Sequence, residues 1–183
     1  MSAHRLRPNF RTVQLDRDNE SAIRQTAVLL LEGFRGPSPL AWPNLDAALA
    51  EVRESFEAGR LSRIAVDADG RVLGWIGGIP QYEGHVWEIH PLVVAADLRR
   101  HGIGRALVED MERLAGDRGG LTLWAGSDDE NNSTSLSAVN LYEDLPGRIA
   151  GIQNLGGHAY EFYQRLGFKI GRASCRERVY VLV

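Results

Sequence analysis

Hydrophobic side chains recur at regular spacing through the first half of the chain, and the spacing changes from one segment to the next. Residues 10–15 alternate between apolar and polar side chains, as in a half-buried strand. Apolar residues at helical spacing predict a helix over 19–34 and a second helix from an Asn44 cap to about Ala58. Two further apolar runs meet at the Asp-Gly pair 69–70, which is typical of the tight turn of a β-hairpin.

The second half of the chain continues with alternating strands and helices. Residues 86–94 are the most strand-like run, apolar positions from Ile103 to about Arg118 follow a helix, and 121–126 indicate another strand. A short helix within 159–168 runs into a last strand. This order of elements predicts a single α/β domain with a mixed central sheet and flanking helices.

Composition narrows the class of protein. The chain has 183 residues, enough for one domain with a core, and its net charge of −3 gives no general attraction to nucleic acid. The start of the sequence lacks the apolar stretch of a secretory signal, and no run reaches membrane-spanning length, so we expect a cytoplasmic protein without a membrane partner. Cys175 is the single cysteine, which excludes a disulfide framework and a cysteine metal cluster.

The strand-like run 86–94, VWEIHPLVV, contains three residues that do not suit a buried strand. Glu88 and His90 are ionisable, and Pro91 has no N–H group to donate to a sheet. A proline inside a strand pattern indicates an edge strand or a bulge. Strict alternation would place the side chains of Glu88, His90 and Leu92 on one face of the strand.

A glycine-rich turn lies between this strand and the next helix. Glycines allow a ligand to approach the backbone closely, and a helix N-terminus offers unpaired N–H groups to an anion. A dinucleotide fingerprint would need Gly or Ala at the position of Leu107, and the Gly-Lys-Ser/Thr of a Walker A loop does not follow. The turn therefore predicts a pyrophosphate site of another kind, the alternative being a plain surface turn. Its candidate residues are Arg99, Arg100, His101, Gly102, Ile103, Gly104 and Arg105.

Two motifs stand at separate places in the chain. Arg-x-x-Gly-x-Gly begins at Arg99, at a strand–helix junction, and Phe-Tyr-x-x-x-Gly-Phe begins at Phe162 and ends at Phe168. Together they resemble the GNAT superfamily of acyl-coenzyme A N-acyltransferases. The runs VWEIHPLVV, GGLTLWAGSDDE and YEFYQRLGFKI, the last preceded by IQNL, are similar to those of the aminoglycoside 6′-N-acetyltransferases, and this resemblance covers about residues 40–170.

The resemblance implies the GNAT fold, in which a parallel strand pair splays apart, and acetyl-coenzyme A as cosubstrate with no metal. The splay would begin at Pro91. Beyond it, backbone groups of Leu92, Val93 and Val94 would pair with the pantetheine arm. The freed Leu92 N–H would face the acetyl carbonyl and stabilise the negative charge that develops there. The resemblance also places Asn154 near pantetheine, although an asparagine at this position could equally cap a helix.

The resemblance further implies acid–base roles, because an acceptor amine must lose a proton and a departing thiolate gains one. Glu88 would hold the ammonium group and help to remove its proton, and a purely structural strand carboxylate is the alternative. Tyr163 would contact the cofactor and protonate the thiolate, while Phe162 suits the role of core aromatic better. His90 is expected to be a hydrogen-bonded core histidine.

An acidic stretch and two aromatic residues are the candidates for acceptor binding. Residues 127–144 contain no Lys or Arg, and their charge would steer a polyamine sugar, although a solvated acidic loop is the usual interpretation. Trp42 and Tyr82 resemble subgroup positions that line the sugar site and could equally be ordinary packing. The subgroup often has further acids in this stretch, and this chain has Asn131 and Asn140 where acids would be plausible, which leaves the range of drugs and the efficiency open. The acidic candidates are Asp128, Asp129 and Glu130.

The sequence thus predicts an acetyl-coenzyme A-dependent N-acetyltransferase that modifies the 6′-amine of aminoglycoside antibiotics by direct transfer, a resistance activity. One alternative is a GNAT enzyme that acetylates another cationic amine, such as a polyamine or a peptide amine. A second alternative is a non-catalytic regulatory module that binds acyl-coenzyme A. The resemblance also implies a homodimer with a small-molecule substrate and no nucleic-acid partner.

The end of the chain departs from the family pattern. After GFKI the family continues through a Gly/Pro-rich turn into a last strand, whereas this chain continues as GRASCRERVYVLV. Because IGRASCRERV resembles the translated read-through of a common sequencing adapter, we expect the single domain 1–183 to end in a non-native tail from about residue 170. A divergent native tail is the alternative. The run VYVLV has strand propensity and could still pair with the strand at Phe168.

Overall fold

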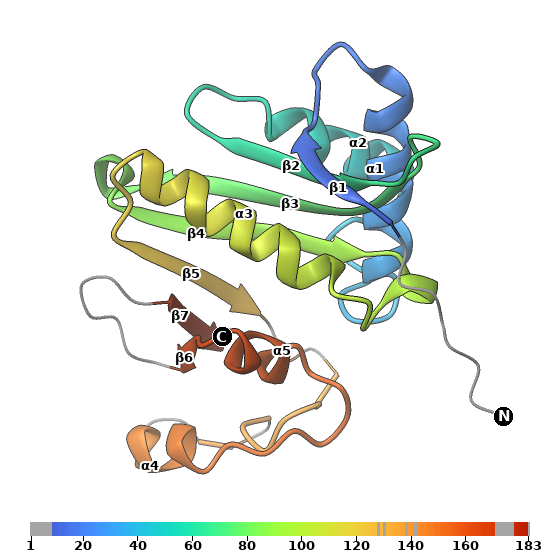
Figure 1. The fold of residues 1–183 in the computed structure, drawn as a ribbon. Helices are drawn as coiled ribbons and strands as arrows, with labels where there is room; N and C mark the ends of the chain where they lie inside the picture. Colours follow the sequence, from blue (N-terminus) through green and yellow to red (C-terminus); the bar gives the residue numbers. More distant parts are fainter. Residues whose placement is uncertain are drawn as a thin grey trace, which may run out of the picture.

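The structure is a computed structural model that describes residues 9–127, 129, 131–137, 139–140, 143–170 and 178–182. One seven-stranded sheet forms its centre, and helices cover both faces of the sheet (Figure 1). A membrane span would need a longer and more apolar helix than any in the described part of the chain. The architecture is the mixed α/β sheet with flanking helices that the sequence predicts.

The first half of the chain forms the antiparallel arm of the sheet and two helices. Both helices begin where the sequence predicts, because Asn19 and Asn44 cap them with side-chain oxygens that accept the N–H groups of Ala22 and Ala47. Caps of this kind contribute about 1 kcal/mol each. The elements are β1 (Arg11–Gln14), α1 (Glu20–Phe34), α2 (Leu45–Glu54), β2 (Leu61–Val66) and β3 (Val72–Gln81).

The centre of the chain forms the unit of strand, turn, helix and strand that contains most of the predicted site. Its long strand and helix have the bounds that hydrophobic spacing predicts, and the strand pairs antiparallel with β3. The elements are η1 (Tyr82–Gly84), β4 (Val86–Val94), η2 (Ala96–Leu98), α3 (Ile103–Asp117) and β5 (Thr122–Ser127). β4 and β5 are the parallel pair, which completes the predicted mixed sheet.

The last part of the chain contains one helix that hydrophobic periodicity does not predict. This helix is α4, and it begins because Asp144 accepts the Gly147 N–H and Pro146 occupies its first turn. The elements are α4 (Leu145–Ala150), α5 (Tyr160–Arg165), β6 (Lys169–Ile170) and β7 (Arg178–Leu182). The strand order of the complete sheet is β1-β2-β3-β4-β5-β7-β6.

Two hydrophobic cores lie on opposite faces of the sheet. Trp75 of β3 is fully buried among residues of α1 and α2, whereas its neighbour Ile76 packs with residues of α3 and α5. Successive residues of a strand point to opposite faces, so this one pair of neighbours reaches both cores. Burial of side chains on both faces explains why β3 consists almost entirely of apolar residues and glycine.

The predicted bulge in β4 is confirmed and lies at His90 and Pro91. β3 and β4 pair at Ile76↔Leu92 and next at Gly78↔Ile89, so β4 carries one more residue than β3 between these pairs. Only a glycine fits opposite, because a Cβ atom at Gly77 would overlap the carbonyl oxygen of His90. A bulge inserts an extra residue and re-aims the side chains that follow it.

The bulge overturns the expectation that Glu88, His90 and Leu92 share one face. His90 contacts α2, and Glu88 lies two residues before it on the same side of the strand. Leu92 instead packs with the core on the α3 side, and Val93 now points toward α1 and α2. Strict alternation fails here because the extra residue reverses the facing of every later side chain.

The predicted splay between β4 and β5 is also confirmed. The two strands pair from Val86 to Ile89, where Ile89 lies opposite Ala125, and no pair beyond these is found in the described residues. On the other edge of β4, the Ala95 N–H donates to Leu73 O at 2.9 Å. Hydrogen-bonded and non-hydrogen-bonded positions alternate along an antiparallel pair, so the N–H groups of Leu92 and Val94 point away from β3 and into the splay.

β7 lies between β5 and β6 and runs parallel to both, so the run VYVLV does pair with the strand that follows Phe168. Only residues 171–177 separate β6 from β7. Parallel neighbours usually need a connection of about a dozen residues or more. We propose that the short connection reflects a non-native sequence from about residue 170.

Resequencing the 3′ end of the native gene tests this proposal. We expect the native reading frame to differ from this chain after about Lys169 and to encode a longer turn before its last strand. An unchanged GRASCRERVYVLV in the native gene would show that the tail is a divergent native one.

Candidate active site

The glycine-rich turn forms the N-terminus of α3, as predicted. Arg100 and Gly102 have positive φ angles of 66° and 89°, and Gly102 occupies the cap position, where no side chain accepts a helix N–H. The first N–H groups of α3 are therefore available to an external acceptor, and the helix dipole favours an anion there. The ring of His101 turns back to the Arg99 carbonyl oxygen at 3.0 Å.

Gly104 allows three elements to meet at the start of α3. A Cβ atom at this position would lie 3.2 Å from the ring of Phe162 in α5 and 3.6 Å from Val94 of β4. The absence of a side chain therefore lets α5 and the splayed end of β4 approach the N-terminus of α3 closely. An anion at this helix end would lie beside the unpaired edge of β4, which is the geometry that the pyrophosphate and pantetheine of coenzyme A require.

The carboxylate of Glu88 lies just before the splay and is half-buried. Gln81 of β3 donates its side-chain amide to this carboxylate at 2.5 Å. Burial raises the pKa of Glu88 above its ordinary value, and the positive charge of His90 partly opposes this rise. Gln81 was not a sequence candidate, and it reaches Glu88 because it lies two residues beyond Ile79, the partner of Glu88 in the pairing of β3 with β4.

His90 is not the core histidine that we expected, since its side chain is 44% exposed. Its Nε2 lies 3.7 Å from Oε1 of Glu51, which comes from α2 and is only 17% exposed. The other oxygen of Glu51 accepts the indole N–H of Trp42 at 3.2 Å. Trp42 packs edge-on against Phe34 at 4.7 Å between ring centroids and lies 6.1 Å from the His90 ring.

These contacts place Trp42 beside the strand that carries Glu88, and its role as a wall of the acceptor site stays a prediction. Glu51, which contacts both Trp42 and His90, was not a sequence candidate. It lies on α2 among other charged residues, so nothing in its neighbourhood along the chain marks it as different from a solvated helix acid.

Tyr82 lies at the turn between β3 and β4 and is 76% exposed. Ordinary core packing is therefore excluded as its role. Tyr82 and Glu83 both have positive φ angles, 49° and 58°, which are uncommon for residues other than glycine. The turn presents the phenol to solvent directly after Gln81, the residue that binds Glu88.

Tyr163 lies on the opposite side of the sheet from Glu88. It is 7% exposed within the core that α3 and α5 form, and its ring packs edge-on against Phe162 and Phe168 at 5.0 and 5.1 Å. Phe162 is the less buried of the pair, so the expectation that it is the principal core aromatic is wrong. Leu92 packs in the same core as Tyr163, which places this phenol on the side of the splay that the glycine turn also borders.

The acidic stretch after β5 is only partly described, and its predicted steering residues Asp128 and Glu130 lie outside the described residues. Asp129 accepts hydrogen bonds from the N–H groups of Ser133 and Thr134 and from the Thr134 hydroxyl, at 2.6, 3.0 and 2.7 Å. Burial acts to raise the pKa of Asp129, but these hydrogen bonds and the charge of His158 lower it overall. Asp129 therefore holds its own loop in shape.

The cap position of α5 is Ala159 and no side chain caps this helix, so Asn154 is not the helix cap that was its alternative interpretation. Its side-chain oxygen accepts the N–H groups of Gly156, Gly157 and His158, and its amide donates to the His158 carbonyl at 3.1 Å. The residue thereby shapes the turn that leads into α5. The predicted contact of Asn154 with pantetheine stays a prediction.

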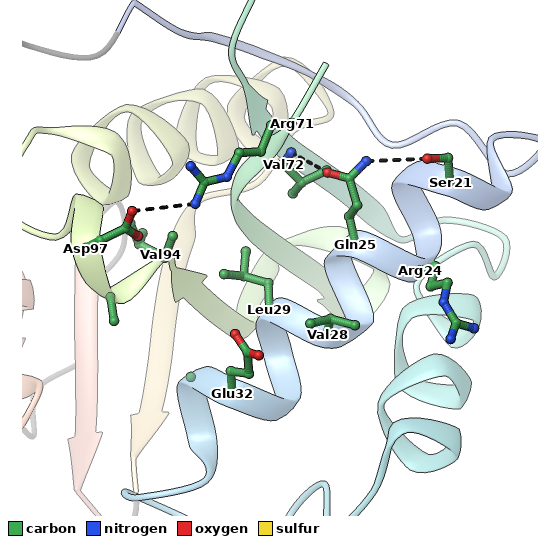
Figure 2. Close-up of a pocket in the computed structure, with 13 residues that line it drawn as sticks. Ser21, Arg24, Gln25, Val28, Leu29, Glu32, Arg71, Val72, Val94 and Asp97 are labelled. Carbon is green, nitrogen blue, oxygen red and sulfur yellow. Dashed lines mark hydrogen bonds and ion pairs between the residues drawn. The ribbon is translucent and has the colours of Figure 1, made fainter. Parts of the chain in front are cut away.

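A cavity of about 580 Å³ lies elsewhere, between α1 and the ends of β3 and β4 (Figure 2). Some of its lining groups contact one another: Arg71 lies 3.5 Å from Asp97, and Gln25 accepts the Val72 N–H. Val94 is the one candidate residue in its lining, so the cavity does not coincide with the site at the splay. In the described part of the chain, no three His, Cys, Asp or Glu residues are grouped to hold a metal ion.

Comparisons with known proteins agree with this geometry. Residues 28–145 match the acetyltransferase (GNAT) family. A solved aminoglycoside 6′-N-acetyltransferase complexed with coenzyme A is 40% identical with a TM-score of 0.76, over 86% of this chain and 83% of that one. The aminoglycoside 6′-N-acetyltransferase from Enterococcus faecium is 39% identical with a TM-score of 0.77, over 88% and 86%. An aminoglycoside 6′-acetyltransferase type Ii is 29% identical with a TM-score of 0.62, over 88% and 84%. No curated protein sequence matches.

Replacement of Gly104 by valine tests the anion site at the start of α3. The new side chain would push the Phe162 ring and Val94 away from the helix N-terminus. We expect coenzyme A affinity, measured by calorimetry, to fall at least about tenfold, or 1.4 kcal/mol. Gly116→Ala is the matched control, because a Cβ there, in the same helix, meets nothing within 4 Å. Unchanged affinity in a folded Gly104→Val protein would contradict the assignment.

Proposed function

Because the chain belongs to the GNAT family of acetyltransferases, we propose that it uses acetyl-coenzyme A to acetylate the 6′-amine of aminoglycoside antibiotics. The transfer is direct, within a ternary complex, and inactivates the drug. The observation that carries this proposal is the pair of solved aminoglycoside 6′-N-acetyltransferases at 40% and 39% identity over most of both chains. The splayed strands, with a carboxylate on one face and a buried phenol on the other, supply the chemistry.

The residues around the splay fit acetyl-coenzyme A, which supplies the activated acetyl group. Leu92 and Val94 present N–H groups to a pantetheine amide, whereas the Val93 N–H faces β3 by the same alternation. The uncapped start of α3 receives the pyrophosphate, and Arg99, Arg100 and Arg105 add positive charge around it. His101 and Ile103 shape the turn rather than contact the phosphates through their side chains.

Glu88 accepts the proton that the acceptor amine must lose, directly or through water. A carboxylate whose pKa is raised by burial is a better base than an exposed one, because the transferred proton then binds more strongly. The base is active only when ionised, so turnover falls as pH drops through the raised pKa of Glu88. Gln81 holds the carboxylate in one orientation for this transfer.

The N–H of Leu92 stabilises the negative charge that develops on the acetyl oxygen. It is fixed by the bulge before the reaction begins, so no reorganisation is needed when the charge appears. Tyr163 donates a proton to the departing thiolate from the α3 side of the sheet. The base and the acid therefore act on opposite faces, and the acetyl group passes through the splay between them.

The acceptor lies on the α1 and α2 side, against Trp42, Tyr82 and Glu88. Aromatic faces suit sugar rings and nearby ammonium groups, and the carboxylates of Glu88 and Glu51 favour a polycation. Since acetyl-coenzyme A is a metabolite of the cytoplasm, we place the enzyme there. We also propose a homodimer, which light scattering on the native sequence would test.

Glu88→Gln should lower kcat/KM for the acceptor about 10- to 1000-fold, because it removes the base and the charge partner of the ammonium. The decline of wild-type kcat/KM toward low pH should disappear in this variant. Rates measured between pH 5 and 9 test this, with Glu54→Gln on the outer part of α2 as the charge-matched control. Retention of the wild-type pH dependence by the Glu88 variant would exclude Glu88 as the base.

Tyr163→Phe should lower kcat about 10- to 1000-fold while the Kd for acetyl-coenzyme A changes little. The substitution keeps the ring that packs between Phe162 and Phe168, so the fold is preserved. Stopped-flow thiol release and calorimetry separate the two effects. A kcat equal to that of the wild type would leave Tyr163 as a core aromatic only.

The product made from kanamycin tests the function itself. We expect mass spectrometry and NMR to find a single acetyl group on the 6′-nitrogen, and 6′-hydroxyl analogues to remain unmodified at that position. Acceptor affinity should weaken as salt rises, because partly exposed ion pairs are screened over about 8 Å at physiological ionic strength. Acetylation of spermidine with no kanamycin product would instead indicate an enzyme for another cationic amine.

A further inference from the structure

Asn131 connects two segments that lie far apart in the sequence. Its side-chain amide donates to the carbonyl oxygen of Pro37 at 2.8 Å and to that of Gly36 at 3.2 Å. Gly36 and Pro37 belong to the loop between α1 and α2, and Asn131 follows the end of β5. One amide group thus donates to two neighbouring carbonyl oxygens and joins the two segments.

This contact crosses the splay on the acceptor side. The C-terminal end of α1 lies directly over β4, because a Cβ at Gly33 would meet the side chain of Val93. β5 forms the other border of the splay and ends at Ser127, four residues before Asn131. The amide of Asn131 therefore reaches from the β5 border to the loop above β4, on the face where His90 contacts α2.

Both ends of this connection are held in place. The loop between α1 and α2 also carries Trp42, whose indole N–H is bound by Glu51 beside His90. The segment that carries Asn131 is fixed by Asp129, which accepts the N–H groups of Ser133 and Thr134. A contact between two fixed segments determines the width of the opening between them.

We propose that Asn131 is a positioning residue of the acceptor site, which clasps the Trp42 loop to the segment after β5 and sets the space available to the acceptor. The proposal rests on the proposed function for its kinetic consequences. It also accounts for the residue type. Two carbonyl oxygens need a donor, and the amide of asparagine supplies one, whereas an aspartate would place carboxylate oxygens against them.

The isosteric variant Asn131→Asp distinguishes two roles of position 131, because they predict opposite changes in the KM for kanamycin. If an acid at this position attracts the cationic sugar, the new charge should lower that KM. If Asn131 is a clasp, repulsion from the two carbonyls should raise that KM about tenfold or more. Asn131→Ala, which loses the hydrogen bonds without adding repulsion, should raise it about three- to tenfold. The KM for acetyl-coenzyme A should change less than about twofold in each.

Asn132→Asp is the matched control, because it adds the same charge one residue away. Asn132 accepts a hydrogen bond from the Ser137 hydroxyl, a role that aspartate keeps, and aspartate tolerates the positive φ of 53° at this position. We expect its KM for kanamycin to stay at or below that of the wild type. A lower KM in both aspartate variants, or equal KM values in all variants, would overturn the proposal.

Hydrogen exchange of the unliganded protein tests the clasp without any acceptor. In Asn131→Ala and Asn131→Asp, peptides that cover residues 34–43 should exchange faster than in the wild type and in Asn132→Asp. Unchanged exchange there would overturn the clasp even if activity differs. If the wild type acetylates no aminoglycoside but exchange increases as expected, the proposed acceptor is wrong and the clasp itself stands.

Discussion

The single residue that β4 carries in excess of β3 determines the architecture of the site. At His90 and Pro91 the pairing with β3 shifts by one residue, and pairing with β5 has already ended at Ile89. An extra residue in one strand turns the later side chains to the other face, so the irregularity that directly follows the end of the β4–β5 pairing also exchanges the faces of β4. Gly77 makes this possible, because no side chain would fit against the His90 carbonyl.

The exchange of faces separates the two halves of the proposed chemistry. Before the bulge, Glu88 points toward α1 and α2, where a half-buried carboxylate can meet a cationic amine. After the bulge, Leu92 packs with Tyr163 on the side of α3 and α5. The amine and the thioester can thus approach the splay from opposite faces of the sheet, so neither reactant must pass the other, and the backbone edge between them stays free to bind.

The acceptor side depends on polar contacts between elements that are distant in sequence. Glu51 is mostly shielded from water and binds Trp42 beside His90, and Asn131 bridges from the segment after β5 to the loop that carries the same Trp42. Hydrogen bonds of this kind contribute about 1 kcal/mol each, so their effect is mainly to fix geometry.

The sequence by itself determined the secondary-structure elements and the turns and caps that bound them, because these depend on neighbours along the chain. The start of α1, the cap at Asn44, the bulge at Pro91 and the glycine turn before α3 could all be predicted from local composition. Only the tertiary structure decided which face each side chain occupies and which distant groups meet. In it, His90 lies half-exposed beside Glu51, and Gln81 binds Glu88. The side chains of Asp129 and Asn154 bind backbone groups of their own loops. Such contacts join residues through space, and no periodicity along the chain records them.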